Sequence, residues 1–271
     1  MADSVQRFYD GLSDGYHLLF ADWDASVRRQ GEVLDRLIQR ELGRGPDPSQ
    51  EASAVSVLDC SCGIGTQAIG LAGCGYRVHG TDLSPAAVAR AAREAARLGV
   101  PLTTGVADLR ALDTVPGTFD VVLSCDNALP HLLTDDDLAL AARGMYARLR
   151  QGGLLIISLR DYDRLLAERP RAELPRVFDR PEGRQIAFQV WDWHPEAPTY
   201  TLHQFIVWEG LTPGAQEASD VGWQTHHEAT IYRALQRRDL TAILQQTGFR
   251  EPRWHEPDET GYYQPIITAQ K

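Results

Sequence analysis

The segment 55–66, with the sequence VSVLDCSCGIGT, constrains the fold more than any other part of this chain of 271 residues. It begins with a β-branched and aliphatic run that is typical of a buried parallel strand. Asp59 ends this run, and Gly63 and Gly65 follow before a helical pattern begins at Thr66. Glycines at a strand-to-helix turn permit positive φ, and the helix directs free N–H groups towards a bound ligand. The segment therefore predicts a ligand-binding α/β domain.

The carboxylate of Asp59 discriminates between the ligands that such a turn can hold. The stretch 63–68, GIGTQA, also satisfies the loose dinucleotide fingerprint. A pyrophosphate there would lie close to Asp59, and like charges in a partly dry site repel each other strongly. S-adenosylmethionine has an ammonium and a sulfonium but no phosphate, so the same carboxylate favours it. An acid followed after three residues by Gly-x-Gly resembles the first motif of class I S-adenosylmethionine-dependent methyltransferases.

Composition narrows the range of partners. Acidic residues outnumber basic ones by 37 to 27, which gives a formal net charge of −10. No Lys/Arg cluster with interleaved aromatic residues occurs, so we expect no nucleic-acid partner. No apolar run approaches the ~18 residues needed to span a bilayer, and no signal peptide is evident. We therefore expect a cytoplasmic protein without a membrane partner.

No metal site is expected. Cys60 and Cys62 lie too close together for metal-finger spacing, and no His/Cys pair follows them. His226 and His227 are adjacent on an expected strand, so their side chains would point to opposite faces. Three acidic residues at 135–137 follow Thr134 and are better explained as the first turn of a capped helix.

Strands and helices alternate after the glycine segment. Further strands are expected over 76–82, 100–106, 118–124 and 154–158. The helical patterns between them predict right-handed crossovers and a mostly parallel sheet with helices on both faces. The segments 250–255 and 262–269 are expected to form a hairpin at the sheet edge, with the last strand antiparallel.

The expected fold class is α/β, a Rossmann-like class I methyltransferase sheet with two additions. Residues 3–42 have a helical pattern with an aromatic-rich face, and 43–53 form a linker. Alternating strands over 184–193, 200–208 and 223–232 indicate a small inserted antiparallel sheet. The domains expected are a helical lid over 1–50, a cofactor-binding core over 51–160, the insert over 161–233, and a helix with a hairpin over 234–271.

The ends of the parallel strands supply the candidate cofactor residues. Asp82 follows the glycines by about 20 residues, where a carboxylate can accept hydrogen bonds from both ribose hydroxyls; alternatively it caps the next helix. An acid after the third strand, Asp108, can accept from the adenine amine while Leu109 packs on the ring. The remaining cofactor candidates are Leu83 and Cys125 in the core, and Tyr16, Trp23 and Arg29 in the lid.

From the fourth strand onward the sequence resembles the glycine and sarcosine N-methyltransferases. The motifs that carry the resemblance are FDVV at 119–122, Asn127, His131, GGLLII at 152–157 and RDYD at 160–163. The resemblance covers roughly residues 58–166. It implies that Asn127 and Arg160 hold an amino-acid substrate, Arg160 by its carboxylate, with Tyr162 nearby. It also implies that His131 lies by the methionine end of the cofactor.

Two of these roles have alternatives. The guanidinium of Arg160 follows a buried strand and could form a bidentate pair with a substrate carboxylate, or a salt bridge with Asp161 or Asp163. His131 could act as a general base or as a structural hydrogen-bonding residue. Methyl transfer from a sulfonium requires in-line approach and a dry pocket more than a strong base.

The sequence also departs from this family. Two cysteines lie in the glycine loop, Asp126 stands where the family often has a small residue, and segments 169–183 and 191–195 have no counterpart. These departures leave the acceptor open. The residues expected to line or cover the acceptor pocket are His203, His226, His227, Tyr262, Tyr263 and Gln264.

The sequence thus predicts methyl transfer from S-adenosylmethionine to the amine nitrogen of a small molecule, by in-line displacement. The acceptor would be an amino acid such as glycine or sarcosine, or an amine-bearing natural product, and S-adenosylhomocysteine would be the product. The alternatives are a small-molecule O-methyltransferase, an NAD(P)-dependent dehydrogenase and a non-catalytic cofactor-binding scaffold. Homo-oligomerisation, if it occurs, is expected through the inserted sheet or the N-terminal helices.

Overall fold

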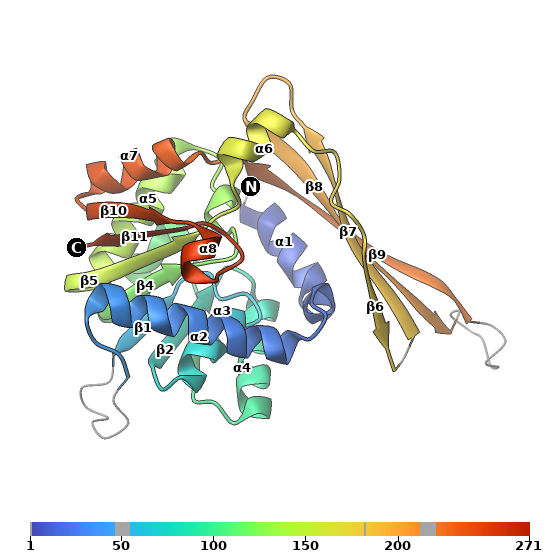
Figure 1. The fold of residues 1–271 in the computed structure, drawn as a ribbon, viewed down its shortest axis with the longest axis horizontal. Coiled ribbons are helices and arrows are strands. Elements are labelled where there is room, and N and C mark those ends of the chain that lie inside the picture. Colours follow the sequence, from blue (N-terminus) through green and yellow to red (C-terminus); the bar gives the residue numbers. More distant parts are fainter. Residues whose placement is uncertain (1, 47–54, 182, 212–220) are drawn as a thin grey trace.

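A seven-stranded sheet forms the centre of the protein in a computed structural model that describes residues 2–46, 55–181, 183–211 and 221–271 (Figure 1). The strand order is β10-β11-β5-β4-β1-β2-β3. Strands β1 to β5 pair in parallel, while β11 is antiparallel to both β5 and β10. The predicted sheet is thereby confirmed. Its strands are β1 (Ser56–Asp59), β2 (Arg77–Asp82), β3 (Thr103–Val106), β4 (Phe119–Ser124), β5 (Leu149–Ser158), β10 (Arg250–His255) and β11 (Ile266–Gln270).

Helices cover both faces of this sheet, and each face has its own apolar core. One core includes side chains of α5 (Asp135–Arg148) and α7 (Arg237–Thr247), and the other includes side chains of α2 (Trp23–Leu42) and α3 (Thr66–Gly73). The remaining helices of the core are α4 (Pro85–Leu98), α6 (Tyr162–Glu168), α8 (Pro257–Thr260) and the 3-10 turns η3 (Leu109–Thr114) and η4 (Leu129–His131). As predicted, Thr134 caps α5 by accepting a hydrogen bond from the Asp137 N–H.

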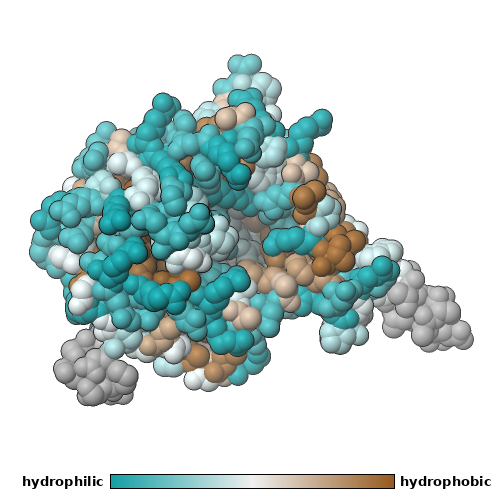
Figure 2. All heavy atoms as spheres, viewed as in Figure 1, coloured by the Kyte–Doolittle hydropathy of each residue, from teal (hydrophilic) through white to brown (hydrophobic). Residues whose placement is uncertain are grey.

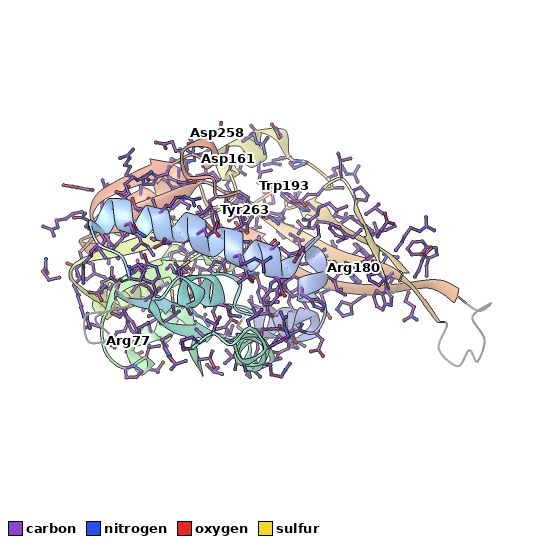
Figure 3. All side chains as sticks on the ribbon, turned by 60° about the horizontal axis from the view of Figure 1, so that its bottom comes forward. Arg77, Asp161, Arg180, Trp193, Asp258 and Tyr263 are labelled. Carbon is purple, nitrogen blue, oxygen red and sulfur yellow. The ribbon has the colours of Figure 1, made fainter. Side chains whose placement is uncertain are left out.

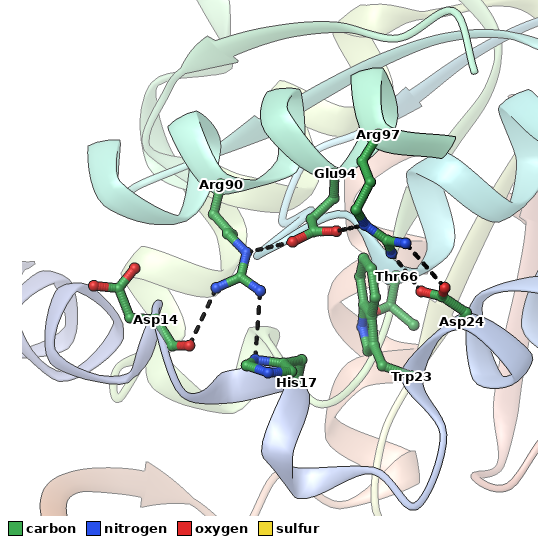
Figure 4. Close-up of polar contacts among 8 residues, drawn as sticks. All are labelled: Asp14, His17, Trp23, Asp24, Thr66, Arg90, Glu94 and Arg97. Carbon is green, nitrogen blue, oxygen red and sulfur yellow. Dashed lines mark hydrogen bonds and ion pairs between the residues drawn. The ribbon is translucent and has the colours of Figure 1, made fainter. Parts of the chain in front are cut away.

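The helical pattern predicted over residues 3–42 is present but interrupted. The structure divides it into α1 (Ala2–Leu12), η1 (Tyr16–Leu19) and α2. Asp22 starts α2 by accepting from the Ala25 N–H at 2.9 Å, a cap that competes with helix continuation. Figure 4 shows how polar contacts connect the segment between α1 and α2, and the first turn of α2, to α4 through Arg90, Glu94 and Arg97. Most of the predicted linker, residues 47–53, lies outside the described residues.

Helices α2 and α3 approach each other through two glycines. A Cβ placed on Gly70 would lie 2.5 Å from the carbonyl oxygen of Val27 and 2.9 Å from the Cα of Gly31. These are backbone atoms, so a flexible side chain cannot move aside to relieve the contact. The close packing holds α3, and the glycine turn that precedes it, against the N-terminal region.

Gly70→Ala should therefore lower the free energy of unfolding by ~1–3 kcal/mol, the usual cost of overpacking a dense interface. Gly73→Ala, at the end of the same helix, provides the matched control because no atom lies within 4 Å of its added Cβ. Denaturant unfolding of both variants would check this prediction. Equal stability of the two would show that the interface accommodates a methyl group.

The insert forms a separate four-stranded antiparallel sheet, ordered β6-β7-β8-β9. Its strands are β6 (Arg176–Arg180), β7 (Gly183–Trp193), β8 (Thr199–Leu211) and β9 (Val221–Arg233). The sequence predicts the last three strands. Strand β6 lies in the segment 169–183, for which the sequence predicts no structure. Helix α1 lies between this sheet and the core (Figure 1), and Phe8 and Leu12 pack there against Trp191, Tyr200 and Tyr232.

The outer surface is mainly polar. Figure 2 shows a largely hydrophilic face on which hydrophobic residues gather where the core meets the inserted sheet. Among the described residues, none of the helices combines the length and apolar character needed to cross a bilayer.

Candidate active site

The glycine turn after β1 has the backbone geometry that its sequence requires. Gly63 and Gly65 have φ values of 53° and 97°, a region that L side chains rarely adopt. A Cβ on Gly65 would also lie 2.7 Å from the Cδ1 of Ile69. The Gly63 N–H donates to Oδ2 of Asp82 at 2.8 Å, which connects this turn to the end of β2.

Asp59 is buried beside this turn with part of its hydrogen-bonding capacity unused. Its side chain is 1% exposed, and Oδ1 accepts from the Ser61 N–H at 3.2 Å. Among the described residues, Oδ2 has no hydrogen-bond partner. Burial raises the pKa of Asp59 to about 8. A buried, unpaired carboxylate is costly unless an opposite charge joins it, so this residue fits a cationic ligand group.

Two small cavities adjoin the turn and bring together most of the predicted cofactor residues. The first has a volume of about 70 Å³ and the second about 50 Å³. Both are covered by residues from the N-terminal helices, including Tyr9 of α1. Predicted residues line the first at Asp82, Leu83, Asp108, Leu109 and His131, and the second at Tyr16, Gly63, Asp82 and Cys125.

Two acidic candidates also have structural partners. Oδ1 of Asp82 accepts from the Ser84 N–H at 2.9 Å, but Ser84 itself is the cap of α4. The Asp108 carboxylate accepts from the backbone N–H of Arg110 at 2.8 Å and from its guanidinium, which lowers the pKa of Asp108 despite the burial of that carboxyl group. Both carboxylates are therefore oriented by hydrogen bonds at the wall of the first cavity.

Trp23 and Arg29 are placed elsewhere. The indole of Trp23 is buried and donates to Oγ1 of Thr66 at 3.1 Å, so it secures α2 against the start of α3 (Figure 4). It lines none of these cavities. Arg29 is exposed and lines a third, larger cavity.

This large cavity, of about 790 Å³, lies between the core, the N-terminal helices and the inserted sheet. Figure 3 shows Asp161 and Tyr263, two of its lining residues, near the junction of core and insert, whereas Arg77 lies far from them in the core. Of the residues expected at an acceptor pocket, Tyr263 and Gln264 line it. His203 and His227 instead contact each other at 3.0 Å on the exposed face of the inserted sheet.

Arg160 projects into this cavity without a close carboxylate. Its guanidinium donates to the Tyr200 hydroxyl at 3.0 Å and to Oε1 of Gln189 at 2.9 Å, and lies 4.8 Å from the centre of the Trp191 ring. The nearest acidic partner among the described residues is Glu173 at 3.9 Å. The alternative pairing with Asp161 or Asp163 does not occur; both lie near Arg237, at 3.9 and 3.8 Å.

Asn127 adjoins Arg160. Its Oδ1 accepts from the backbone N–H of Arg160 at 3.2 Å, and its Nδ2 has no hydrogen-bond partner among the described residues. Tyr162 is different: its side chain is 1% exposed, its hydroxyl lies 3.0 Å from that of Tyr200, and it does not line the cavity. Tyr162 thus supports a neighbour of Arg160.

His131 lies in an aromatic environment. Its Nε2 is 2.9 Å from the Tyr9 hydroxyl, and its ring centre is 4.1 Å from that of Tyr232. Burial lowers the pKa of His131 to about 3. The imidazole is therefore neutral at physiological pH and a weak base, which favours the structural alternative over general-base catalysis.

Sequence reasoning missed several residues of these cavities. Phe8 and Tyr9 belong to the aromatic-rich helical segment predicted over residues 3–42, and Gln189 lies within the strand predicted over 184–193, but neither pattern indicates a site role. Asp126 was noted only as a departure from the family pattern. Its position directly after β4, beside Asn127, was the signal that could have identified it.

Residues 57–153 match the family model of a methyltransferase domain. The part of the chain that matches this family model contains the glycine turn, most of the parallel strands β1 to β4, and the acidic candidates Asp59, Asp82 and Asp108. Residues 57–153 thus resemble a methyltransferase domain, which supports the class I S-adenosylmethionine-dependent methyltransferase fold and cofactor that the sequence predicts.

Two curated relatives are named for methylation of different atoms, one of nitrogen and the other of oxygen. Glycine/sarcosine N-methyltransferase of Parasynechococcus marenigrum is 35% identical over 162 residues, which are 59% of this chain and 53% of the relative. Ubiquinone biosynthesis O-methyltransferase of Methylocella silvestris is 35% identical over 128 residues, 47% of this chain and 44% of the relative. The chain thus matches about half the length of each.

Solved structures match this chain over most or nearly all of its length. DesVI of Streptomyces venezuelae aligns with a TM-score of 0.70 at 17% identity, covering 99% of this chain and 97% of that one. CalS10 of Micromonospora echinaspora, an amino pentose methyltransferase, aligns with a TM-score of 0.67 at 17% identity, covering 91% and 92%. At this identity the likeness shows a shared fold and nothing further.

Proposed function

We propose that this protein transfers a methyl group from S-adenosylmethionine to an amine nitrogen of a small molecule. The observation that carries the proposal is the buried Asp59 carboxylate, whose free oxygen lies beside the glycine turn and suits a cationic donor. The glycine/sarcosine N-methyltransferase relative supports nitrogen as the acceptor atom. The ubiquinone O-methyltransferase relative makes oxygen the second candidate.

The residues around the small cavities have complementary roles towards the donor. Asp59 would pair with its ammonium, the two oxygens of Asp82 would accept from its ribose hydroxyls, and Asp108 with Leu109 would hold its adenine. When bound, S-adenosylmethionine supplies an electrophilic methyl carbon on a sulfonium. The other residues proposed for this site are Tyr16, Gly63, Gly65, Leu83, Cys125 and His131.

The large cavity would receive the acceptor. The guanidinium of Arg160 has no carboxylate within 3.5 Å among the described residues, and Asn127 Nδ2 is free beside it, so the pair offers donors to an anionic or oxygen-rich group. Aromatic rings of Trp191 and Tyr232 lie against the Arg160 guanidinium, and a less polar surrounding strengthens such a contact. Orientation of the acceptor, rather than strong base catalysis by His131, would be the main contribution of these residues.

Methyl-labelled S-adenosylmethionine with a panel of paired amines and alcohols would test this function. The panel contains glycine with glycolate, sarcosine, and glucosamine with glucose. We expect label on nitrogen, located by mass spectrometry of the fragmented product. Label on oxygen alone would establish the second candidate, and donor binding without any transfer over a broad amine panel would indicate a scaffold.

Asp82→Ala should weaken binding of S-adenosylhomocysteine by ~1–3 kcal/mol, because ribose hydroxyls would be left unpaired in a partly dry site. The Gly63 N–H would lose its acceptor as well. Titration calorimetry provides the measurement, with Asp113→Asn on the exposed surface of η3 as the control. Unchanged affinity in Asp82→Ala would remove the ribose assignment.

A further inference from the structure

Asp126 lies where the cofactor side and the acceptor side of the site meet. It lines the large cavity together with Arg160, and also the small cavity formed by the glycine turn. A methyl group leaving a donor at the turn for an acceptor in the large cavity must cross this junction. Asp126 is therefore positioned for the reacting centre rather than for the distal part of either ligand.

Two hydroxyl groups hold the Asp126 carboxylate at the junction. Tyr16 donates to Oδ2 at 3.2 Å, and Tyr263 donates to Oδ1. The backbone N–H of Asp126 donates to Oγ of Ser158 at 2.8 Å. No Arg, Lys or His forms an ion pair with this carboxylate among the described residues. A carboxylate can accept about four hydrogen bonds, so it retains capacity for a cationic group.

The backbone at this point is strained. Asp126 and Asn127 have φ values of 58° and 67°, and consecutive left-handed residues that are not glycine are uncommon. Such conformations tend to occur at functional sites. The strain places an acid, and the amide that supports Arg160, at neighbouring positions of the same cavity wall.

We propose that Asp126 binds the amine nitrogen of the acceptor in its ammonium form and accepts a proton from it before methyl transfer. An N–H bond of the ammonium breaks, an O–H bond forms on the carboxylate, and the lone pair of the neutral amine becomes available to the methyl donor. The methylated product leaves as an ammonium, and Asp126 returns its proton to solvent. This inference rests on the proposed function and specifies its substrate class: a primary or secondary amine that is cationic in solution.

The surroundings of Asp126 suit a proton acceptor. Desolvation raises the pKa of this carboxyl group, while the tyrosine hydrogen bonds and nearby guanidinium groups oppose the rise. A raised pKa of the carboxyl group lies closer to the pKa of an amine, and a smaller difference between the two eases the proton transfer. The titratable and charged groups that face it from the surrounding elements are Tyr9, Tyr16, Cys125, Arg160, Arg176, Tyr262 and Tyr263.

Asp126→Asn isolates the charge, because asparagine tolerates the left-handed conformation. Its Oδ1 can still accept from one tyrosine, and its Nδ2 can donate to the hydroxyl oxygen of the other. We use the amine of the panel that wild type methylates fastest. At pH 7 the variant should lose at least 100-fold in kcat/KM, and the loss should shrink as pH approaches the pKa of the amine, where neutral acceptor is abundant. Asp163→Asn, on the exposed surface of α6, is the matched control.

Binding of S-adenosylhomocysteine and the melting temperature separate this proposal from structural damage. Both should remain at wild-type values in Asp126→Asn. The proposal is overturned if the variant keeps wild-type kcat/KM at pH 7, if its defect is the same at every pH, or if cofactor binding falls equally. If wild type methylates only hydroxyl groups, the amine assignment fails, whereas absence of any transfer is a failure of the proposed function itself.

Discussion

Asp59→Asn should weaken binding of S-adenosylmethionine by ~2–5 kcal/mol, about 30-fold to several thousandfold, because the ammonium of the ligand would lose a desolvated partner. The side chain keeps its size, and its Oδ1 can still accept from the Ser61 N–H. Titration calorimetry at pH 7 measures the loss. Asp113→Asn should bind as wild type does, and an Asp59→Asn protein of undiminished affinity would contradict the electrostatic assignment.

The same substitution should stabilise the empty protein as the pH rises. Burial raises the pKa of Asp59 to about 8, above its unfolded value near 3.8, so the folded state holds a proton that the unfolded state has lost. This contribution to stability is complete below pH ~4 and disappears as the pH rises towards 8. The advantage of Asp59→Asn in unfolding free energy should therefore grow between pH 5 and pH 8 and then level off. A constant difference would contradict the raised pKa.

Binding should also release a proton. At pH 6, Asp59 of the empty protein is protonated, and pairing with the donor ammonium favours its ionised form. Calorimetry in buffers of different ionisation enthalpy detects this release directly. In Asp59→Asn the buffer dependence should vanish.

Arg160→Met should lower kcat/KM for the acceptor by about 100- to 1,000-fold, since removal of one partner of a buried charged contact costs ~2–5 kcal/mol. Most of the loss should appear in KM if Arg160 holds a non-reacting end of the acceptor. Affinity for S-adenosylhomocysteine should be unchanged. Steady-state kinetics with the best amine of the panel, together with calorimetry, separate the two effects.

Arg164→Met is the matched control for this substitution. Arg164 lines the same cavity but has an exposed side chain, so its removal changes the charge without removing an inward contact. Its kcat/KM should stay within a few-fold of wild type. An equal loss in both variants would indicate that Arg160 acts only through the overall charge of the cavity.

The parallel core could be predicted from sequence because its signals are local. The run before Asp59, the glycines after it, and the alternation of strands with helices each depend on residues close together in the chain. The breaks around η1 could not be predicted in the same way, since Arg90 and Arg97 of α4 bind that segment from afar. The strand β6 was missed because its residues are mostly exposed and its pattern does not alternate clearly.

In the candidate site too, positions set by local sequence signals could be predicted, whereas contacts between distant segments could not. Residues fixed to strand ends, such as Asp82 and Asn127, lie where the topology predicts. Trp23 does not line the described cavities. An aromatic residue at helical spacing can pack in a core as well as in a pocket, and here the indole N–H of Trp23 donates to Thr66. The contacts of Arg160 with Gln189 and Tyr200 come from the inserted sheet, whose placement over the core no local pattern encodes.

Parallel calorimetric titrations of the wild-type protein with S-adenosylhomocysteine and with NADH test the central claim most directly. Asp59 at the tip of β1 should ionise to pair with the ammonium of the phosphate-free ligand, a contact that a pyrophosphate cannot make. We therefore expect saturable binding of S-adenosylhomocysteine and no detectable heat from NADH. Binding of NADH without binding of S-adenosylhomocysteine would contradict the account.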